Sequence, residues 1–340
     1  MKKIIAVFFI VAAFVLFSWC TKKPSIFEYN DNVVLVADEN LWSEVSAEIK
    51  AAIEKEMHTP LVEKVFTIIR IDPSEVETVT PYPHVVFVGT LASTGITEEI
   101  LMQLLDDSAR DKVMQDQAFI FQKQDAWSEN QLLLVLAGKD AETLEANIEQ
   151  NQDFIFQYLD DHADKVAYEN VYRGYSQEDL TKKLMDKHGW TVRVQHDYFA
   201  AIDSADAQFV WLRRFEPQRN LFVHWQTTDD STMLSKEWMA QTRDSLTQLY
   251  YKGDYILQSD EIPLKDKVVE FQGRQAIRVD GVWQNDEYVV GGPFRSYGFY
   301  DDLNNKLYLI DLSVFAPDAL KWPYMRQIDV MAKTFRIQQQ

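Results

Sequence analysis

The sequence predicts two folding units of different class. The first is an α/β unit, a mixed sheet with flanking helices, and the second is an α+β unit, a mainly antiparallel sheet with helices packed on it. Two observations predict this arrangement. Short continuous apolar runs, typical of buried strands, alternate with amphipathic helical segments as far as residue 172. After a helix-start signal at Ser176, strands with period-two alternation follow one another with few helices between them.

The first half is predicted to alternate between strands and helices. A strand at 32–37 precedes a helix over 38–57, whose apolar residues from Leu41 to Met57 share one face. Further elements are expected in this order: strands at 65–71 and 84–89, a helix at 97–105, two strands around a Ser-Glu-Asn turn within 117–138, and a long helix capped near Asp140. The unit should therefore extend over residues 32–172.

The second unit, residues 173–340, is predicted to open with a helix. "SQED" (176–179) is a capping box, and Gly189 is a suitable residue to end the helix after His188. Strands are expected in the runs 190–194, 209–214, 221–226, 268–273, 275–283, 294–300 and 306–315. Acidic and asparagine residues at 301–305 predict a hairpin loop. Helices are expected at about 235–250 and 323–335, with Pro323 in the first turn of the second.

The amino end has the features of a secretion signal followed by a cysteine. Met1-Lys2-Lys3 is a positive head, and the 16 residues after it, 4–19, carry no charge. A helix of that length rises about 24 Å at about 1.5 Å per residue, which is shorter than the hydrocarbon core of about 30 Å. The run therefore fits the apolar core of a signal peptide. Cys20, the only cysteine of the chain, follows directly, and a polar stretch begins after it.

This layout resembles a bacterial lipoprotein signal, with a signal peptide at 1–19 and a lipidated Cys20 plus tether at 20–31. The predicted partner is then a membrane, bound through the lipid, with the body of the protein in the cell envelope. The residues after Cys20 show no acidic export signal, which favours the periplasm. The alternative is an uncleaved signal anchor with Cys20 as an inert thiol, because Trp19 stands where lipoprotein signals usually have a small residue.

The charge of the chain excludes one class of partner. Lys and Arg number 34 against 53 Asp and Glu, for a net charge of −19. Nucleic-acid binding depends on basic residues that neutralise phosphates, so no nucleic-acid partner is predicted. The acidic residues are spread along the chain, which is typical of a solvated surface.

Several segments resemble one family. They are "FVWLRR" (209–214), the strand end at 281–283 and above all "VVGGPFRSYGFYDDLNNKLYLIDLSVFAP" (289–317). In the first half, "VVLVADENLW" (33–42) and "DAWSENQLLLVLAG" (125–138) match as well. Together they are similar to the uncharacterised bacterial envelope lipoproteins grouped as domain of unknown function 4837. That family has no established activity. The resemblance therefore implies an envelope location and a two-part layout, and it supplies no catalytic residues.

A search for catalytic and metal-binding motifs predicts neither. The six histidines form no pair with i,i+4 spacing and no H-E-x-x-H motif, and no G-x-S-x-G occurs. Asp160 and Asp164 would share a helix face, which we interpret as a solvated helix end. No metal, cofactor or catalytic residue is therefore predicted. The sequence favours a non-enzymatic binding or scaffolding lipoprotein with an envelope protein or a glycan as partner. The alternative is a hydrolase acting on cell-wall or carbohydrate substrates, which an unmarked triad or carboxylate pair would allow.

A ligand-binding groove, if the protein has one, is expected in the second unit beside Trp283, Gly291, Gly292, Phe294 and Arg295. The two glycines would let the backbone approach a ligand, and Trp283 ends a strand where its ring could be half exposed. Phe294 and Arg295 should point to opposite faces of their strand, so that Arg295 could meet an anionic group.

The competing interpretation places Trp283 and Phe294 in the core. It explains Gly291 and Gly292 by a backbone bend that needs positive φ, and it assigns the arginines at 213, 214 and 295 to surface ion pairs.

Overall fold

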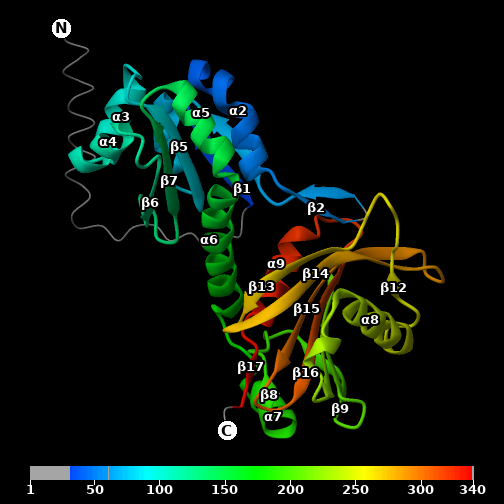
Figure 1. Cartoon of the computed structure of the whole chain (residues 1–340). Helices are drawn as coiled ribbons and strands as arrows, with labels where there is room; N and C mark the ends of the chain where they lie inside the picture. Colours follow the sequence, from blue (N-terminus) through cyan, green and yellow to red (C-terminus); the bar gives the residue numbers. More distant parts are fainter. Residues whose placement is uncertain (1–30, 60, 339–340) are drawn as a thin grey trace. The chain divides into compact units, whose positions relative to one another are not determined.

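The computed structural model describes residues 31–59 and 61–338 (Figure 1). The predicted signal peptide, Cys20 and the tether up to residue 30 lie outside the described residues, as do the last two glutamines. The chain divides into two compact units. The first unit comprises the chain up to Ala47 together with Ile68–Gln150, and the second comprises Glu48–Thr67 together with Asn151–Gln340. Both predicted fold classes are confirmed: the first unit is a sheet with flanking helices, and the second is an antiparallel sheet with helices.

The division between the units differs from the single boundary predicted at 172/173. Helix α6 (Gln152–Tyr172) belongs to the second unit, and so does the hairpin of β2 (Glu56–His58) and β3 (Val62–Lys64). Contacts distant in sequence explain the difference. Arg326 of α9 (Trp322–Ala332) binds Asp160 and Asp164 of α6. The buried carboxylate of Glu63 accepts the backbone N–H groups of Lys321 and Trp322 at 2.7 and 3.0 Å, where α9 begins.

The first unit is a mixed five-stranded sheet in the order β4-β1-β5-β7-β6. β1 (Asn32–Val36), β5 (His84–Thr90) and β7 (Leu132–Gly138) are parallel, and β6 (Ile120–Gln124) is antiparallel to β7; β4 is Thr67–Ile71. Every residue of β5 and β7 is buried, as expected for strands covered on both faces. Figure 1 shows α2 (Glu39–Ile53) and α5 (Ala141–Gln150) on one face, with α3 (Ile96–Leu104) and α4 (Asp107–Met114) on the other. A short 3-10 helix, η1, occupies Pro73–Val79.

Two predicted helices before the second sheet need correction, and a further helix was not predicted. The helix predicted over 38–57 ends at Ile53, and Met57 lies in β2, where pairing with β3 replaces helical hydrogen bonds. The long helix after Asp140 is two helices, α5 and α6, separated at Asn151, whose φ of −124° is not helical. Helix α4 was not predicted, because its segment 107–114 is largely polar and buries only Val113.

The second unit is built on an eight-stranded sheet in the order β12-β14-β15-β16-β11-β10-β9, with β13 also pairing with β14. Its strands are β9 (Phe199–Ser204), β10 (Phe209–Arg214), β11 (Gln218–Thr227), β12 (Tyr255–Ile256), β13 (Lys265–Phe271), β14 (Arg274–Asn285), β15 (Val290–Asp301) and β16 (Lys306–Phe315). Each of the pairs along this order is antiparallel. The hairpin predicted at 301–305 joins β15 to β16, with Asp301 opposite Lys306.

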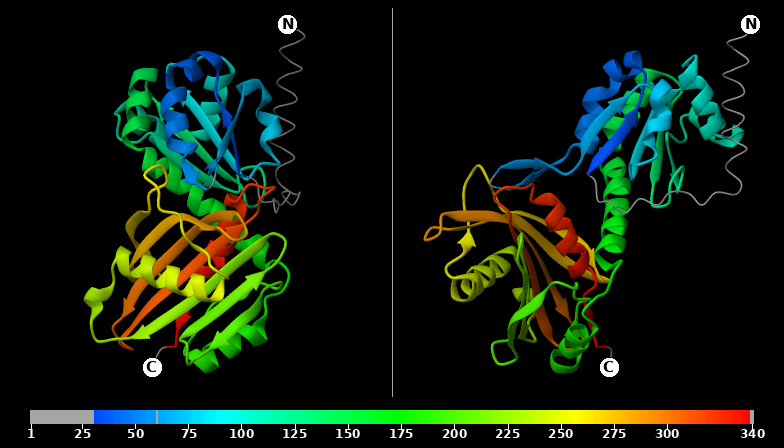
Figure 2. Two further views of the ribbon diagram at one scale, coloured as in Figure 1. Left: turned by 90° about the vertical axis from the view of Figure 1, so that its right-hand side faces the viewer. Right: turned by 180° about the vertical axis from the view of Figure 1, so that it is seen from behind.

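Helices α8 (Lys236–Tyr250) and α9 cover opposite faces of this sheet, as both views in Figure 2 show. The face under α8 is an aromatic core that includes Phe209, Phe222, Trp283 and Phe294. The face under α9 receives Arg295 and Tyr297, which both bind Asp329. Successive residues of β15 therefore point to opposite faces of the sheet, one packed under α8 and the next under α9.

The remaining elements of the second unit are helix α7, a two-stranded sheet and a short 3-10 helix. α7 (Glu178–His188) ends as predicted at Gly189, whose φ of +73° suits glycine. Its start differs, because the position before the helix is Gln177 and its side chain forms no capping bond. β8 is only Trp190–Thr191, paired with β17 (Arg336–Ile337); a short 3-10 helix, η2, occupies Ser231–Met233. Within residues 31–59 and 61–338, no helix has the length and apolarity needed to cross a bilayer.

Candidate functional site

The second unit contains a pocket of about 450 Å³. It lies where α6, β2 and the loop before β13 meet strands β13, β14 and β15, beside the start of α9. Its apolar lining is Met57, Val65, Phe156, Pro263, Gly281, Pro293, Phe294 and Trp322. Its charged lining is Lys55, Glu56, Asp153, Asp160, Lys265, Lys267, Arg278, Asp280 and Arg295. A concave site of this size, with an apolar wall and a few fixed polar groups, has the usual character of a small-molecule site.

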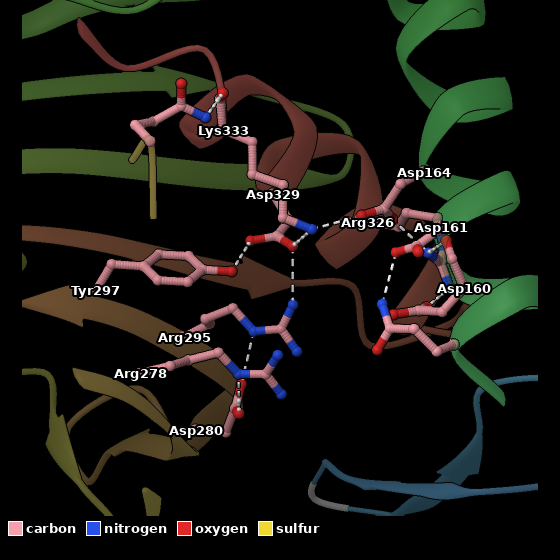
Figure 3. Close-up of polar contacts among 12 residues, drawn as sticks. Asp160, Asp161, Asp164, Arg278, Asp280, Arg295, Tyr297, Arg326, Asp329 and Lys333 are labelled. Carbon is pink, nitrogen blue, oxygen red and sulfur yellow. Dashed lines mark hydrogen bonds and ion pairs between the residues drawn. The ribbon is translucent and has the colours of Figure 1, made fainter. Parts of the chain in front are cut away.

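Arg295 is the central cation of the network beside the pocket (Figure 3). Its Nε donates to Asp280 Oδ1 at 2.7 Å, and its Nη1 donates to Asp329 Oδ2 at 2.9 Å. The hydroxyl of Tyr297 donates to the other oxygen of Asp329 at 2.7 Å. Burial alone would raise the pKa of Asp329, but Lys333 and Arg295 outweigh it and hold that pKa well below its usual range.

Arg278 extends this network towards the pocket. Its Nε donates to Asp280 Oδ2 at 2.7 Å, so Asp280 accepts one hydrogen bond from each of two arginines. Burial acts to raise the pKa of Asp280, and the two guanidinium groups of Arg295 and Arg278 lower it below its ordinary value. The structure records no hydrogen bond from Arg278 Nη1 or Nη2 to any described residue, so both remain available at the pocket.

Two lysines of β13 stand beside these groups. In the sheet register Lys267 is opposite Arg278, and Lys265 is opposite Asp280. Both lysines are exposed, and neither forms a hydrogen bond or ion pair through its side chain with any described residue. The pKa of Lys267 is lowered, first by partial desolvation and then by the positive charges of Arg278 and Arg295.

The helix side of the network joins α6 to α9. Arg326 Nη2 lies 2.7 Å from Asp160 Oδ1, while Asp164 binds both Arg326 and Lys333. Arg326 is 1% exposed, and the pKa of Asp160 is lowered, because the positive charge of Arg326 outweighs the effect of burial. Asp160 and Asp164 share a helix face as predicted, but the interpretation as a solvated helix end was wrong: the face is turned to a buried arginine (Figure 3).

The structure places the predicted groove residues in two different surroundings. Trp283 is 3% exposed and lies in the aromatic core under α8. Gly291 and Gly292 are residues of β15, and neither has the positive φ that the expected bend requires. A Cβ on Gly292 would clash with the carbonyl oxygen of Val314, so the missing side chain lets that neighbouring backbone approach.

Phe294 and Arg295 are the two predicted site residues that line the pocket. They point to opposite faces of β15, as predicted: Arg243 of α8 lies 3.9 Å from the centre of the Phe294 ring, whereas Arg295 binds Asp329 of α9. Arg295 is 4% exposed, so the assignment to a surface ion pair was wrong for this residue.

The other two arginines differ from each other. Arg214 forms the expected ion pair, with Asp197, whereas Arg213 stacks on the rings of Trp211 and Phe215.

Sequence reasoning did not identify Lys265, Lys267, Arg278 or Asp280. The available signal was a pair of lysines, Lys265 and Lys267, in an acidic chain. Residues two apart in a strand lie on the same face. The partner strand and its register come only from the folded sheet. Within residues 31–59 and 61–338, no group of histidine, cysteine and carboxylate side chains could hold a metal ion.

Two family models each match one part of the chain. Residues 177–334 match the model described as domain of unknown function DUF4837. The resemblance seen in the sequence is thus confirmed for this segment. Residues 28–172 match a different model, described as domain of unknown function DUF8532. A resemblance to one family was expected in both halves of the chain. Two different models match instead, one in each part.

Comparison with solved structures adds distant likenesses. No curated protein matches the sequence. Among solved structures, a Bacteroides thetaiotaomicron protein is 7% identical, with 45% of this chain and 46% of that chain covered and a TM-score of 0.28. The Saccharomyces cerevisiae Ran-binding protein Mog1p is 12% identical, with 44% and 90% covered and a TM-score of 0.32. Mycobacterium tuberculosis LpqN, described as involved in cell envelope biogenesis, is 12% identical, with 48% and 98% covered and a TM-score of 0.31.

Proposed function

We propose that the protein is a lipid-anchored envelope protein whose second unit binds a small envelope component without transforming it. The observation that carries the proposal is the pocket of about 450 Å³, which combines an apolar wall with charged groups held by ion pairs. Preorganised side chains of this kind bind at low entropic cost, because little ordering remains when the ligand enters.

The carboxylates of the pocket favour binding over hydrolysis. A glycosidase needs one carboxyl group with a raised pKa that can protonate the leaving group. At this pocket, burial acts to raise the pKa values of Asp160 and Asp280, but neighbouring arginines hold both below the ordinary range. Carboxylates in that state orient arginines and have no proton to donate at neutral pH.

The anchor rests on the sequence at the amino end. An uncharged run of 16 residues that ends at the only cysteine supports cleavage before Cys20 and attachment of a diacylglyceryl group to its thiol. Each buried CH₂ contributes about 0.8 kcal/mol, so two or more chains hold a protein stably to a bilayer. We place the body of the protein in the periplasm.

The anchor is tested by metabolic labelling with a palmitate analogue. The wild type should take up the label, and Cys20→Ser should not. Equal labelling of both forms, or no label in the wild type, contradicts lipidation.

The pocket is tested by capture from envelope extracts with matched variants. Gln157 is an exposed pocket-lining residue of α6, and Gln248 is an exposed residue of α8 that does not line the pocket. Gln157→Trp should obstruct the pocket and lose the envelope component that the wild type retains, whereas Gln248→Trp should retain it. If both variants retain the same component as the wild type, the pocket is not the binding site.

A further inference from the structure

We propose that the pocket of the second unit binds a molecule with an anionic group, a phosphate or carboxylate, joined to an apolar body. The anion would lie between Lys267 and Arg278, and the apolar part would contact Phe156 and Trp322. This inference deepens the proposed function and depends on the same pocket.

The carboxylates that line the pocket are, with one exception, already matched to cations. Asp153 pairs with Lys55, and Asp160 pairs with Arg326. Asp280 accepts from both Arg278 and Arg295. Only the exposed Glu56 forms no side-chain ion pair with a described residue.

The cations, in contrast, are left with unused donors. Lys265 and Lys267 form no ion pair with any described residue, and Arg278 uses only its Nε. In a chain of net charge −19, cations with unused donors gathered at one pocket require an explanation. Arginine and lysine donors of this kind form charge-assisted hydrogen bonds to carboxylates and phosphates.

The sheet register gives this explanation. Lys267 and Arg278 are directly opposite on neighbouring antiparallel strands. Like charges in that position repel each other and destabilise a sheet. An anion between the two side chains would turn the repulsion into attraction. Partial desolvation, followed by the positive charges of Arg278 and Arg295, lowers the pKa of Lys267, and Asp280 and Asp160 offset this only in part.

The position of the guanidinium groups is set before any ligand arrives. Asp280 holds Arg278 and Arg295 by one Nε each, at 2.7 Å in both cases (Figure 3). A second hollow of about 470 Å³ is also lined by Lys265, Lys267, Arg278 and Asp280. Solvent and solutes can therefore reach these donors.

The apolar half of the ligand is specified by aromatic side chains of the lining. Phe156 is half-buried on α6, and Lys55 Nζ lies 5.0 Å from the centre of its ring. Trp322 is 5% exposed at the start of α9, and the Arg295 guanidinium lies 5.6 Å from its ring. An apolar group that enters beside these rings is removed from water while its anion remains at the cations.

The test uses the full chain in phosphatidylcholine nanodiscs and isothermal titration with three soluble probes: phenyl phosphate, phenyl β-glucoside and inorganic phosphate. Phenyl phosphate should bind most tightly, because only it has both parts. Lys267→Glu should weaken its binding by about tenfold or more, which corresponds to loss of a charge-assisted hydrogen bond. The matched control is Lys123→Glu, the same charge change at an exposed residue of strand β6 in the first unit, which should leave binding unchanged.

The outcomes separate this inference from the proposed function. Equal affinity for phenyl phosphate and phenyl β-glucoside would overturn the anion preference and leave a binding pocket in place. Equal affinity for phenyl phosphate and inorganic phosphate would overturn the apolar contact. Unchanged binding by Lys267→Glu, or no binding of any probe, would overturn the inference, while capture with Gln157→Trp tests the proposed function independently.

Competition identifies the source of the anion. Dihexanoyl phosphatidylglycerol that displaces phenyl phosphate, where dihexanoyl phosphatidylcholine does not, would assign a lipid head group. Phenyl phosphate binding that resists both lipids would assign a free organic anion.

Discussion

The two faces of the second unit's sheet use arginine and aspartate in different ways. Under α8, Arg243 Nε lies 2.9 Å from Asp311 Oδ2, and both side chains are 1% exposed. Ser296 is the other side chain that donates to Asp311, and Arg243 Nη1 and Asp311 Oδ1 have no hydrogen-bond partner among the described residues. This is one cation and one carboxylate enclosed in an aromatic core.

Under α9, Asp329 and Asp280 each pair with two cations. Asp329 binds Arg295 and Lys333, Asp280 binds Arg295 and Arg278, and the cluster continues to Arg326 on the same helix. This face borders the pocket through Arg278, Asp280 and Arg295, and the core under α8 contributes Phe294 to the lining.

The pKa values of the carboxylates differ in direction as a result. Burial raises the pKa of Asp311, and Arg243 and Ser296 offset that effect only in part. Burial acts on Asp329 as well, but its several cations lower the pKa. A buried carboxylate thus stays strongly ionised when more than one cation surrounds it, because a single pair does not repay the desolvation of two charges.

The largest effect is expected from Arg295→Met. This change leaves Asp280 without one of its arginines and Asp329 without its guanidinium partner, both at the buried side of the sheet. Breaking a buried pair from one side costs about 3–5 kcal/mol of unfolding free energy, measurable by urea unfolding followed by tryptophan fluorescence. The control is Lys182→Met, which removes an exposed pair with Asp186 and should cost less than about 1 kcal/mol. Equal losses would mean that the network under α9 has no special role.

Trp283→Ala tests the other face. The ring is 3% exposed in the core under α8, and its Nε1 has no hydrogen-bond partner among the described residues. Removing a buried tryptophan costs about 3–5 kcal/mol. Phe154→Ala, at a 66% exposed position of α6, should change stability by less than about 0.5 kcal/mol. A small loss for Trp283→Ala would return this ring to the list of groove residues.

The pH dependence of stability should distinguish the faces by sign. The folded-state pKa of Asp329 lies below its ordinary 3.8, so its contribution is present above that pH and is lost as pH falls. The folded-state pKa of Asp311 lies above 3.8, so in that window the folded state binds more protons and gains stability as pH falls. Below pH 3.8, Asp329→Asn should therefore lose less unfolding free energy than the wild type as the pH falls. Above pH 3.8, Asp311→Asn should lose more than the wild type as the pH falls, because the gain from protonating Asp311 is absent. Urea unfolding at a series of acidic pH values gives both slopes; matching slopes in the two variants would contradict the comparison.

The smallest effect is expected from Lys267→Gln. The lysine is exposed and unpaired with any described residue, so its loss should change the unfolding free energy by less than about 0.5 kcal/mol. The direction should be a slight gain, because a like charge opposite Arg278 is removed. A loss above about 1 kcal/mol would show that the lysine serves the fold, contrary to a role in anion binding.

The sequence by itself determined features that depend on neighbouring residues. Phe294 and Arg295 point to opposite faces because successive residues of any strand do so, and Asp160 and Asp164 share a face because of the helical period. The buried strands β5 and β7 were predicted for a similar reason, since a strand that is covered on both faces has an uninterrupted apolar sequence. The element types and the two fold classes followed from these local patterns.

The tertiary structure determined which residues the side chains on those faces contact. Arg295 and Asp160 were expected at the surface because charged side chains usually are, yet their partners stand 34 and 166 residues away in the chain, at Asp329 and Arg326. The pocket depends on register as well: Lys267 faces Arg278 only in the observed pairing of β13 with β14, and a shift by one residue would turn the lysine to the other face. Such placement could not be read from the sequence, because register and ion pairing over these separations are settled by the burial of the whole sheet and its helices rather than by any local preference.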